Sequence, residues 1–421
     1  MHKYFFVLGS NPNLSKVEIL AFFGETEDLK IITSSKEVLI LETAQEINPH
    51  DLIVKLGGTI KVGEIVDSLA PGDFTEQFPS LATDINFLSK LFDPQLQKIT
   101  FGISVYNAGT TTNQINSILR EATRTLPKMK KFLQTSYRAS FFKPQERSIS
   151  SVSVVKNKLL TEGFELAIFI EEQTILFGKT LAVQNFEDYS FRDYQRPGRD
   201  AEAGMLPPKL AKIMINIAGK DINDTLLDPF CGNGTILQEL ILLGYKNIIG
   251  TDFKSEQIEK TNQNIDWLFQ QYQDLVKSDF NIKTFTYDVR KLNQTFKEEG
   301  IDAIITEPFL GSPKSKHFNI PQIENEIKIL EKLYLDAFYQ FKNILKKNGK
   351  IVIIFPAFKF GNTLHYLNIL PQLFKLGFSP LNFQENSKYK DLNLEVSERG
   401  SIIYSRPDQT IHREIFIFQQ D

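Results

Sequence analysis

The chain of 421 residues contains one cysteine, Cys231, and one tryptophan. A single thiol excludes an intrachain disulfide framework, an iron–sulfur cluster and the cysteine-rich structural zinc sites. Long apolar runs are also missing, because none approaches the roughly 20 residues that span a bilayer. The apolar stretch 3–10 is too short for the core of a signal peptide and has no cleavage site. These absences predict a cytoplasmic protein without a membrane partner.

An excess of either charge is absent as well. The formal net charge is −3, so any contact with nucleic acid must come from a local basic patch. The histidines are few and have none of the spacings of metal ligands, so we predict no metal site; they are His2, His50, His317, His365 and His412. What the chain does have is 35 phenylalanines and 42% hydrophobic residues, enough for more than one globular core.

The hydrophobic pattern divides the first half of the chain into two regions. In residues 1–81 we expect strands over 4–8, 29–33, 38–42 and 59–65, and helices over 14–23 and 50–56. In residues 82–187 we expect strands over 98–106, 150–155 and 164–170, and an amphipathic helix over 113–126. An α+β layer is the natural outcome of this mixture.

A linker is expected over residues 188–203, followed by a domain over 204–421 in which strands and helices alternate. Its strands are expected over 225–227, 247–250, 284–287, 303–306 and 350–355, with helices over 236–243, 255–272 and 322–346. This βαβ pattern is typical of a doubly wound parallel sheet. Residues 401–404 and 411–418, on either side of Pro407-Asp408, predict an antiparallel hairpin at its edge.

The first strand of that domain runs into the loop Asp228-Pro229-Phe230-Cys231-Gly232-Asn233-Gly234-Thr235 and then into a helix. Glycines at such a turn allow positive φ and close approach of a ligand, and the amino end of the helix offers free N–H groups. A dinucleotide oxidoreductase would have a third glycine where Leu237 stands, which disfavours that class. An acid ahead of the glycines suits a ligand with a cationic amino-acid end. We expect Cys231 to pack as a small residue rather than act as a nucleophile.

Two further acids follow the next two strands. Asp252 ends the second strand, where a carboxylate can accept hydrogen bonds from both ribose hydroxyls. Asp288 follows the third strand, where a carboxylate can receive the amino group of an adenine. Each acid alone is more simply explained as a helix cap or a turn residue. Acids at three successive strand ends behind a glycine turn favour a nucleoside site.

The fourth strand ends at Glu307-Pro308-Phe309-Leu310. An enzyme that methylates an exocyclic amine must hold the N–H groups with acceptors and stack an aromatic ring on the extruded base. In this interpretation Glu307 is the acceptor, Pro308 fixes the turn and Phe309 stacks. The alternative is a proline turn that ends a buried strand and has no catalytic part.

A basic stretch lies in the second region. Between residues 120 and 147 two acids oppose eight cations, and four aromatic residues are interleaved. Such a mixture lets a surface bind phosphates and stack bases, although a solvated helix face followed by a core strand explains it too. The candidate RNA-binding residues are Arg120, Arg124, Lys128, Lys130, Lys131, Arg138 and Lys143.

These motifs resemble the THUMP-domain tRNA guanosine-10 N2-methyltransferases, which are class I S-adenosylmethionine-dependent enzymes of the amino-methyltransferase type. The segments that carry the resemblance extend over nearly the whole chain: 6–15, 56–61, 192–193, 196–197, 205–211 and, as the closest match, 228–235. Residues 404–407 in the C-terminal hairpin also fit and receive no role. Residues 307–310 depart from the family's Asp-Pro-Pro-Tyr at three of four positions.

The resemblance implies a ferredoxin-like domain over 1–81, a THUMP RNA-binding domain over 82–187 and a Rossmann-like methyltransferase domain over 204–421. It implies S-adenosylmethionine as the cofactor, tRNA as the partner and an exocyclic base amine as the methyl acceptor, guanine N2 in the position 10 region. Catalytic roles fall to Glu307, Pro308 and Phe309. The implied cofactor contacts are Pro207, Asp228, Pro229, Cys231, Gly232, Gly234, Thr235, Asp252, Phe253, Asp288 and Val289.

Two alternatives stay open. A DNA amino-methyltransferase uses the same catalytic logic, and a THUMP-type tRNA-binding protein can keep the fold with a degenerate catalytic motif. The need for an activator subunit is open as well.

Overall fold

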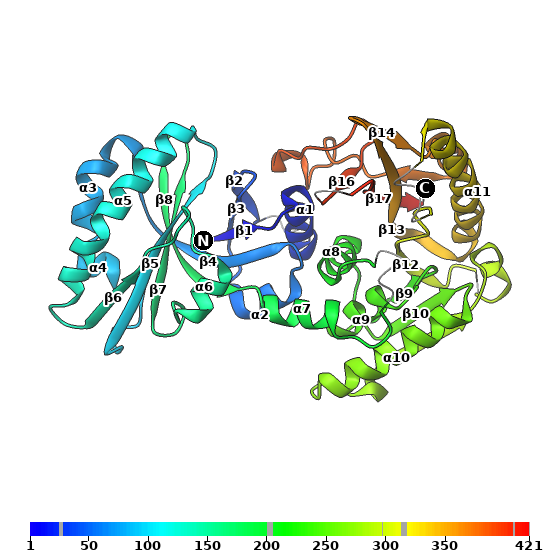
Figure 1. Cartoon of the computed structure of the whole chain (residues 1–421), viewed down its shortest axis with the longest axis horizontal. Coiled ribbons are helices and arrows are strands. Elements are labelled where there is room, and N and C mark those ends of the chain that lie inside the picture. Colours follow the sequence, from blue (N-terminus) through cyan, green and yellow to red (C-terminus); the bar gives the residue numbers. More distant parts are fainter. Residues whose placement is uncertain (25–27, 200–204, 297, 313–317, 407–408, 421) are drawn as a thin grey trace. The chain divides into compact units, whose positions relative to one another are not determined.

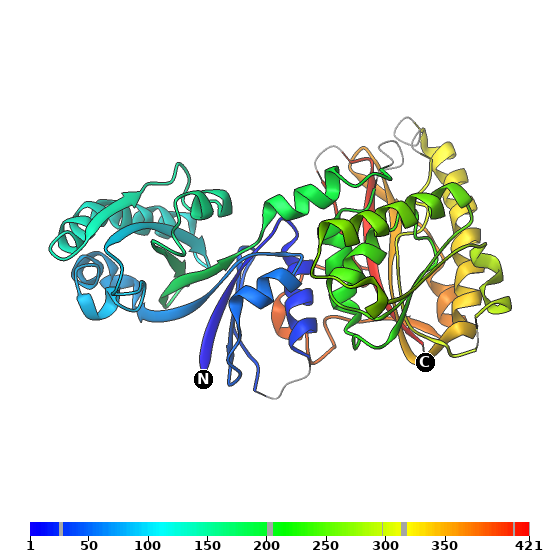
Figure 2. The same ribbon diagram turned by 90° about the horizontal axis from the view of Figure 1, so that it is seen from below.

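The computed structural model describes residues 1–24, 28–199, 205–296, 298–312, 318–406 and 409–420. The chain forms two compact units. The N-terminal unit comprises Met1–Lys16, Glu25–Phe186 and Asp391–Asn393, and the C-terminal unit comprises Val17–Gly24, Glu187–Lys390 and Leu394–Asp421. Figures 1 and 2 show the chain from two sides.

The N-terminal unit begins with a β-α-β-β-α-β arrangement. Its elements are β1 (His2–Leu8), α1 (Pro12–Phe23), β2 (Lys30–Ser34), β3 (Val38–Thr43), α2 (Pro49–Lys55) and β4 (Thr59–Leu69). The strands lie in the order β2-β3-β1-β4, and every neighbouring pair is antiparallel. This is the ferredoxin-like arrangement, and it confirms that part of the expected fold class.

The same sheet continues beyond β4. Its further order is β8-β7-β5-β6, so eight strands form one sheet from residue 2 to residue 183. The added elements are η1 (Pro71–Asp73), α3 (Phe74–Leu81), α4 (Ile85–Leu88), β5 (Lys98–Asn107), α5 (Thr112–Leu133), β6 (Arg138–Phe142), α6 (Ser151–Lys156), β7 (Gly163–Ile170) and β8 (Ile175–Val183). Because β4 and β8 pair directly, the division between residues 81 and 82 stays a prediction.

Two sequence expectations for this unit were wrong. Residues 150–155 are not a strand but α6, because the Ser150 side chain caps the helix by accepting from the Ser153 amide at 3.2 Å. The helix expected to end at residue 126 runs through Pro127 to Leu133. Met129 and Leu133 are both buried there, so packing against the core outweighs the missing proline N–H.

The C-terminal unit is a doubly wound sheet with the strand order β11-β10-β9-β12-β13-β17-β15. The first five are parallel, and β17 runs antiparallel between β13 and β15. The strands are β9 (Thr225–Asp228), β10 (Asn247–Asp252), β11 (Asn281–Thr286), β12 (Ile301–Thr306), β13 (Leu345–Phe360), β14 (Thr363–Tyr366), β15 (Phe378–Pro380), β16 (Ile402–Tyr404) and β17 (Ile411–Gln420). The expected α/β class, with a mostly parallel sheet and an antiparallel C-terminal hairpin of β16 and β17, is confirmed.

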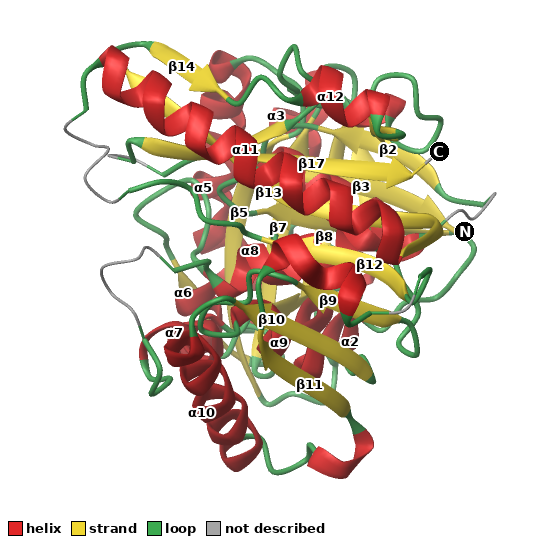
Figure 3. Cartoon of the chain, turned by 90° about the vertical axis from the view of Figure 1, so that its right-hand side faces the viewer, coloured by secondary structure: helices red, strands yellow, loops and turns green. Residues whose placement is uncertain are grey.

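Helices cover both faces of this sheet. They are α7 (Phe186–Tyr194), α8 (Pro208–Ala218), α9 (Thr235–Leu242), α10 (Ser255–Gln271), α11 (Ile320–Ile344) and α12 (Leu370–Lys375), with short 3-10 turns η2 (Lys277–Asp279), η3 (Val289–Gln294) and η5 (Lys390–Leu392). Figure 3 shows α11 lying across β13 and β17, where Phe338, Phe355 and Phe418 form part of a buried aromatic core. Within the residues that the structure describes, no helix is both long and apolar enough to cross a membrane.

The expected linker 188–203 is partly wrong, because its first residues belong to α7. Arg192 on α7 is buried and donates from Nε to Glu239 Oε1 of α9 at 2.7 Å. Lys212 Nζ of α8 lies 3.5 Å from the other oxygen of Glu239. This buried charge cluster fixes α7 to the sheet helices. Residues 200–203, the start of the domain at 204, His317 and the expected turn at Pro407-Asp408 lie outside the described residues.

Candidate active site at the carboxyl ends of the parallel strands

The order of strands reverses between β9 and β12. The chain passes from β9 outward to β10 and β11, then returns to β12 on the other side of β9. Loops leave the two strands in opposite directions at such a switch point, and ligands bind in the crevice outside the carboxyl ends. Asp228 ends β9, Asp252 ends β10 and Glu307 follows β12. The structure therefore brings three predicted site residues to one edge of the sheet.

Asp228 is buried at this edge. Its Oδ1 accepts from the Thr306 hydroxyl at 2.6 Å and from the Phe230 amide at 3.2 Å. Burial raises the pKa of Asp228 to about 7, against the two hydrogen bonds that lower it, and the nearby Asp252 and Glu307 carboxylates raise it further. A carboxyl in this state gains from a cationic ligand group, which would favour its ionised form.

The glycine loop turns sharply between β9 and α9. Gly232 and Gly234 have φ values of +52° and +80°, a region that side chains with a Cβ rarely enter. A Cβ on Gly234 would lie 2.9 Å from Thr261 Cγ2 of α10, whereas a Cβ on Gly232 would meet no atom closer than 4.0 Å. Gly234 is thus required by packing, while Gly232 leaves space open beside its backbone.

Asp252 is tied to that loop. Its Oδ2 accepts from the Gly232 amide at 3.2 Å and its Oδ1 from the Lys254 amide at 3.0 Å. Burial raises its pKa, while the two amide bonds and the Lys254 charge lower it. Phe253 beside it is 68% exposed, so its ring is available to lie against a ligand. The carboxylate ends β10, where the sequence predicts the ribose contact, and the binding of a ribose there stays a prediction.

Asp288 is engaged locally. Its side chain caps η3 by accepting from the Arg290 amide at 3.0 Å, and Arg290 Nη2 donates to Oδ2 at 2.6 Å. This hydrogen bonding with Arg290 lowers the pKa of Asp288. Val289 next to it is buried. The capping role weighed in the sequence is observed, and a contact with adenine stays a prediction that requires Arg290 to turn away.

Cys231 and Thr235 have structural partners in the loop. Cys231 is 5% exposed and burial raises its pKa, so it packs as a small residue, as expected. Thr235 Oγ1 accepts from Nη1 of the buried Arg196 at 2.6 Å. Arg196 Nη2 also donates to Met205 Sδ at 3.3 Å, two residues before Pro207, which precedes α8. Arg196 thus contacts the glycine loop and also Met205.

Glu307 has an ionic partner that the sequence did not indicate. Arg413 Nε of β17 lies 2.5 Å from Glu307 Oε1, and Arg413 Nη2 lies 3.4 Å from Oε2. The two side chains are 12% and 7% exposed for glutamate and arginine. Burial lowers the pKa of Arg413, but the Glu307 carboxylate outweighs it and leaves the pKa raised. Because these residues are 106 positions apart, no local pattern could have paired them.

The residues after Glu307 form a supported turn. Pro308 is buried, whereas the Phe309 ring is 53% exposed. The Tyr334 hydroxyl of α11 donates to the Phe309 carbonyl at 3.2 Å. The backbone is therefore held while the ring remains accessible, which suits a stacking role.

The basic stretch of the N-terminal unit is divided by the fold. On α5 the exposed cations Arg120, Arg124, Lys128 and Lys131 recur at helical spacing and form one stripe, the α5 basic stripe. It lies opposite the buried face that includes Ile118 and Met129. Lys130 is half-buried.

The rest of the stretch lies elsewhere. Arg138 is exposed on β6, where strand alternation turns it away from Ala139 and Phe141, which face the α5 core. Lys143 follows that strand and is exposed. The interleaved rings Phe132, Tyr137 and Phe141 are partly buried against the α5 core, and Phe142 is partly buried against the cluster of Ile149, Val154 and Leu159. Stacking of these rings on bases stays a prediction.

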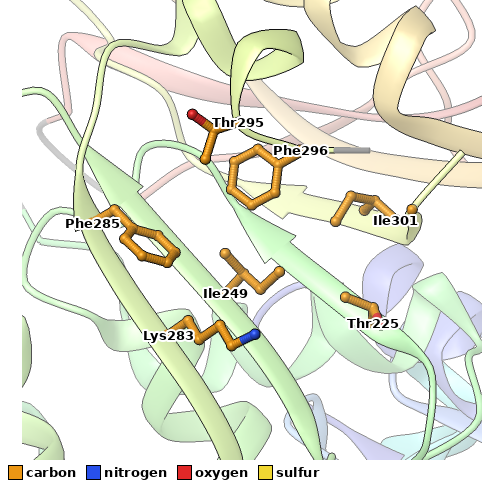
Figure 4. Close-up of a pocket in the computed structure, with 8 residues that line it drawn as sticks. Thr225, Ile249, Lys283, Phe285, Thr295, Phe296 and Ile301 are labelled. Atoms are coloured by element: carbon orange, nitrogen blue, oxygen red, sulfur yellow. The ribbon is translucent and has the colours of Figure 1, made fainter. Parts of the chain in front are cut away.

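A pocket of about 320 Å³ lies in another part of the C-terminal unit. Figure 4 shows Phe285, Phe296 and Ile249 around it, and Thr225 and Ile301 at the amino-terminal starts of β9 and β12 complete its wall. None of the predicted site residues lines it. Ligand binding at a switch point occurs at the opposite, carboxyl ends of the strands, so this pocket is not the site described above.

Comparison with known protein families bears directly on this site. Residues 196–362 match the family model described as the RMKL-like methyltransferase domain. That range contains the ends of β9, β10, β11 and β12, with the four predicted acidic site residues that follow or end them. This part of the C-terminal unit is similar to the methyltransferase domains of that family. A second model, described as DNA methylase, matches residues 113–263, and only part of that range lies in the methyltransferase domain.

Curated relatives match about half of the chain. The chain is 28% identical over 202 residues to the tRNA (guanine(10)-N2)-dimethyltransferase of Methanothermobacter thermautotrophicus, covering 48% of this chain and 51% of that protein. It is 30% identical over 192 residues to the protein of the same name from Methanocaldococcus jannaschii, covering 44% and 48%. The chain thus spans about half the length of the curated relatives it matches.

One solved structure resembles the whole chain. TrmN from Thermus thermophilus aligns over 100% of both chains with a TM-score of 0.56 and 14% sequence identity. At this identity the likeness concerns the fold alone. It agrees with the two units described here, an N-terminal α+β sheet and a doubly wound methyltransferase domain.

Proposed function

We propose that this protein transfers a methyl group from S-adenosylmethionine to an exocyclic amine of a tRNA base, with guanine N2 as the acceptor. The observation that carries the proposal is the meeting of Asp228, Gly232 and Asp252 with Glu307 at one switch point. The names of the curated relatives support both the reaction and the acceptor. A tRNA acceptor also supports a cytoplasmic location.

The described residues fit S-adenosylmethionine. The open space beside Gly232 admits the ligand next to the backbone, and Asp228 is a buried carboxyl that gains from the ammonium group of the methionine part. Asp252 retains lone pairs for ribose hydroxyls, since each of its oxygens accepts one main-chain N–H. When bound, the cofactor supplies a methyl group on a sulfonium centre. The protein's part is to hold both reactants in line.

For the acceptor, Glu307 accepts from the base amine and Phe309 stacks on the base. The Tyr334 hydroxyl keeps the turn between them in place through the Phe309 carbonyl. Ordered acceptors and a held ring lower the barrier chiefly by orientation. The longer glutamate in place of the family's aspartate or asparagine is steadied by Arg413.

For the RNA, we propose that the N-terminal unit combines a ferredoxin-like domain over 1–81 with a THUMP domain over 82–187. The α5 basic stripe extends over roughly 16 Å from Arg120 to Lys131 at 1.5 Å per residue. Among the residues that the structure describes, one acid pairs with it, Glu121 at 3.9 Å from Arg124. A stripe of this kind attracts backbone phosphates without reading sequence.

The test is a methyl-transfer assay on bulk tRNA that compares the wild type with Glu307→Gln and Glu307→Ala. We expect both variants to bind S-adenosylmethionine in calorimetry like the wild type but to lose about 100-fold or more in rate. Unchanged rates would refute the role of Glu307. A wild type that fails to bind the cofactor would refute the proposed function. Gel shifts with tRNA and duplex DNA separate RNA from DNA as the substrate.

A second candidate function is tRNA binding without methyl transfer. It is favoured by one observation, that Arg413 already occupies the acceptor carboxylate. Mass spectrometry of nucleosides from the tRNA of a deletion strain decides between the two. A missing N2-methylguanosine mark supports the enzyme, and an unchanged set of marks supports the binding protein.

A further inference from the structure

The pair of Glu307 and Arg413 is asymmetric. The guanidinium holds Glu307 Oε1 closely, at 2.5 Å from Nε, but its Nη2 lies 3.4 Å from Oε2. Ordinary N–H···O bonds measure about 2.7–3.2 Å. One carboxylate oxygen is therefore committed to the arginine, while the other is only loosely engaged and keeps the capacity to accept from a ligand.

The arginine has donors to spare. A guanidinium carries five N–H groups, and the two contacts with Glu307 use one on Nε and one on Nη2. The second hydrogen of Nη2 is used by neither contact, and Nη2 itself lies 3.4 Å from the loosely held Oε2. Together these two atoms present a hydrogen-bond acceptor and a hydrogen-bond donor side by side.

The pair lies at the edge of the site, with the Glu307 side chain 12% and the Arg413 side chain 7% exposed. Glu307 follows β12 at the switch point, and Arg413 reaches it from β17, opposite Tyr404 of β16. The Arg406 side chain donates to the Tyr404 hydroxyl at 3.1 Å. Tyr404 and Arg406, from the segment 404–407 to which the sequence assigned no role, thus lie beside the strand that carries Arg413. Pro407 lies outside the described residues.

An acceptor beside a donor matches one feature of the bases that carry an exocyclic amine. In adenine, cytosine and guanine the amino group is attached to a carbon that also carries an unprotonated ring nitrogen. The amine donates and the ring nitrogen accepts. In guanine the ring nitrogen is N3, whereas the other neighbour, N1–H, is a donor. Since the arginine fork faces both carboxylate oxygens, Glu307 cannot also take N1–H and N2–H as a parallel pair.

We propose that Glu307 and Arg413 read the amine-bearing edge of the acceptor base jointly. Glu307 Oε2 accepts from the amine, and Arg413 Nη2 donates to the ring nitrogen beside it, which is N3 if the base is guanine. Arg413 is thereby a specificity-determining residue. This inference rests on the proposed methyl transfer and adds the edge by which the base is held.

The experiment uses the full chain and two synthetic tRNA substrates, one with guanosine and one with 3-deazaguanosine at the methylated position. The analogue keeps the N2 amine but lacks the N3 acceptor. We expect the wild type to have a kcat/KM about tenfold lower on the analogue, the effect of one lost hydrogen bond. In Arg413→Met we expect the rate on guanosine to fall at least as far and the preference between the two substrates to disappear.

A matched control is Arg399→Met. Arg399 Nε lies 3.0 Å from Oε1 of the buried Glu414, so this variant also removes an arginine from an ion pair, and the carboxylate it leaves is that of the β17 residue next to Arg413. We expect it to keep the wild-type preference for guanosine. If Arg413→Met does not fold, as judged by circular dichroism, Arg413→Lys replaces it, with an expected preference below about threefold because an ammonium lacks the planar fork.

The outcomes separate the two proposals. Equal wild-type rates on both substrates, or a preference that survives in the folded Arg413 variant, overturn the joint reading and leave methyl transfer intact. A wild type that methylates neither substrate overturns the proposed function, and the joint reading with it.

Discussion

At the scale of single residues, Asp228 and Glu414 are two buried carboxyls of the methyltransferase domain with similar proton affinity. Burial raises the pKa of each to about 7, against the hydrogen bonds from Thr306 and Ser401 and the charge of Arg399, which lower it. Asp228 lies at the switch point, whereas Glu414 accepts from the Ser401 hydroxyl at 2.8 Å. The two carboxyls therefore change protonation over the same pH range, but only Asp228 belongs to the proposed cofactor site.

The first prediction concerns pH. An unfolded aspartate has a pKa of about 3.9, so between pH 4 and pH 7 the folded state binds more protons than the unfolded state and stability falls as pH rises. Asp228→Asn removes this loss. Urea titrations at pH 5 and pH 8 give the free energy of unfolding of both proteins. We expect the difference between Asp228→Asn and the wild type to increase in favour of the variant by on the order of 2 kcal/mol from pH 5 to pH 8. Glu414→Gln is the control and should gain similarly. Only Asp228→Asn should weaken S-adenosylmethionine binding; equal binding in both variants would contradict the cofactor role.

The second prediction separates conformation from ligand space. Gly232 and Gly244 both have positive φ, at +52° and +87°, and a Cβ at either would meet no atom closer than 4.0 Å. Gly232→Ala and Gly244→Ala should each cost about 1 kcal/mol of stability through backbone strain. Calorimetry should show loss of S-adenosylmethionine binding in Gly232→Ala alone. If both variants bind equally well, the space beside Gly232 is not the cofactor's.

At the scale of elements, α7 shows how a segment that reads as a linker becomes part of a domain. Arg192 is 3% exposed and its partner Glu239 is 1% exposed. Tyr189 of the same helix lies 4.5 Å below the Arg192 guanidinium. These contacts join α7 to α9. A local sequence pattern cannot predict them, because Arg192 and Glu239 are 47 positions apart.

The third prediction follows from this burial. Arg192→Met leaves Glu239 short of a hydrogen-bonded partner, and we expect it to destabilise the methyltransferase domain by about 3 kcal/mol. The control is Lys277→Met, which breaks an ion pair with Asp266 of 2.6 Å whose side chains are 61% and 57% exposed. It should cost less than about 1 kcal/mol. Similar shifts of the denaturation midpoint for both variants would contradict the anchoring role of Arg192.

Which elements could be predicted depends on how far apart their determinants lie in the chain. The loop 228–235 and the strands around it are contiguous, so a local pattern identified them. The wrong strand at 150–155 has β-branched residues, but Ser150 caps it as a helix. The sequence did not predict strand β8, which lies between β4 and β7 in the sheet and pairs with both. Arg413 meets Glu307 only through the tertiary fold.

At the scale of the whole molecule, the charge distribution bears on the proposed binding of RNA. The net charge of −3 is small, so under that proposal the attraction to phosphate comes from the α5 basic stripe and not from the chain as a whole. Helix α11 in the methyltransferase domain offers a comparison, since its exposed Lys328, Lys332 and Lys342 are mixed with acidic residues.

The fourth prediction concerns salt dependence. Changing Arg124, Lys128 and Lys131 to glutamine removes about three phosphate contacts, so log K for tRNA should fall less steeply with log salt, by about 2 in slope. The matched triple variant of Lys328, Lys332 and Lys342 should leave the slope unchanged. Fluorescence anisotropy at several salt concentrations measures both. A shift of slope in the α11 variant alone would move the RNA surface away from α5.

The position of β17 affects the order in which the site forms during synthesis of the chain. This strand contains the final described residues, and it lies between β13 and β15 rather than at an edge. During synthesis β9, β10 and β12 leave the ribosome first, so the glycine loop can form while Glu307 still lacks its arginine. Glu307 gains its ion pair with Arg413 only when β17 enters the sheet. A nascent chain halted before residue 413 would therefore have the glycine loop beside a Glu307 without its ionic partner.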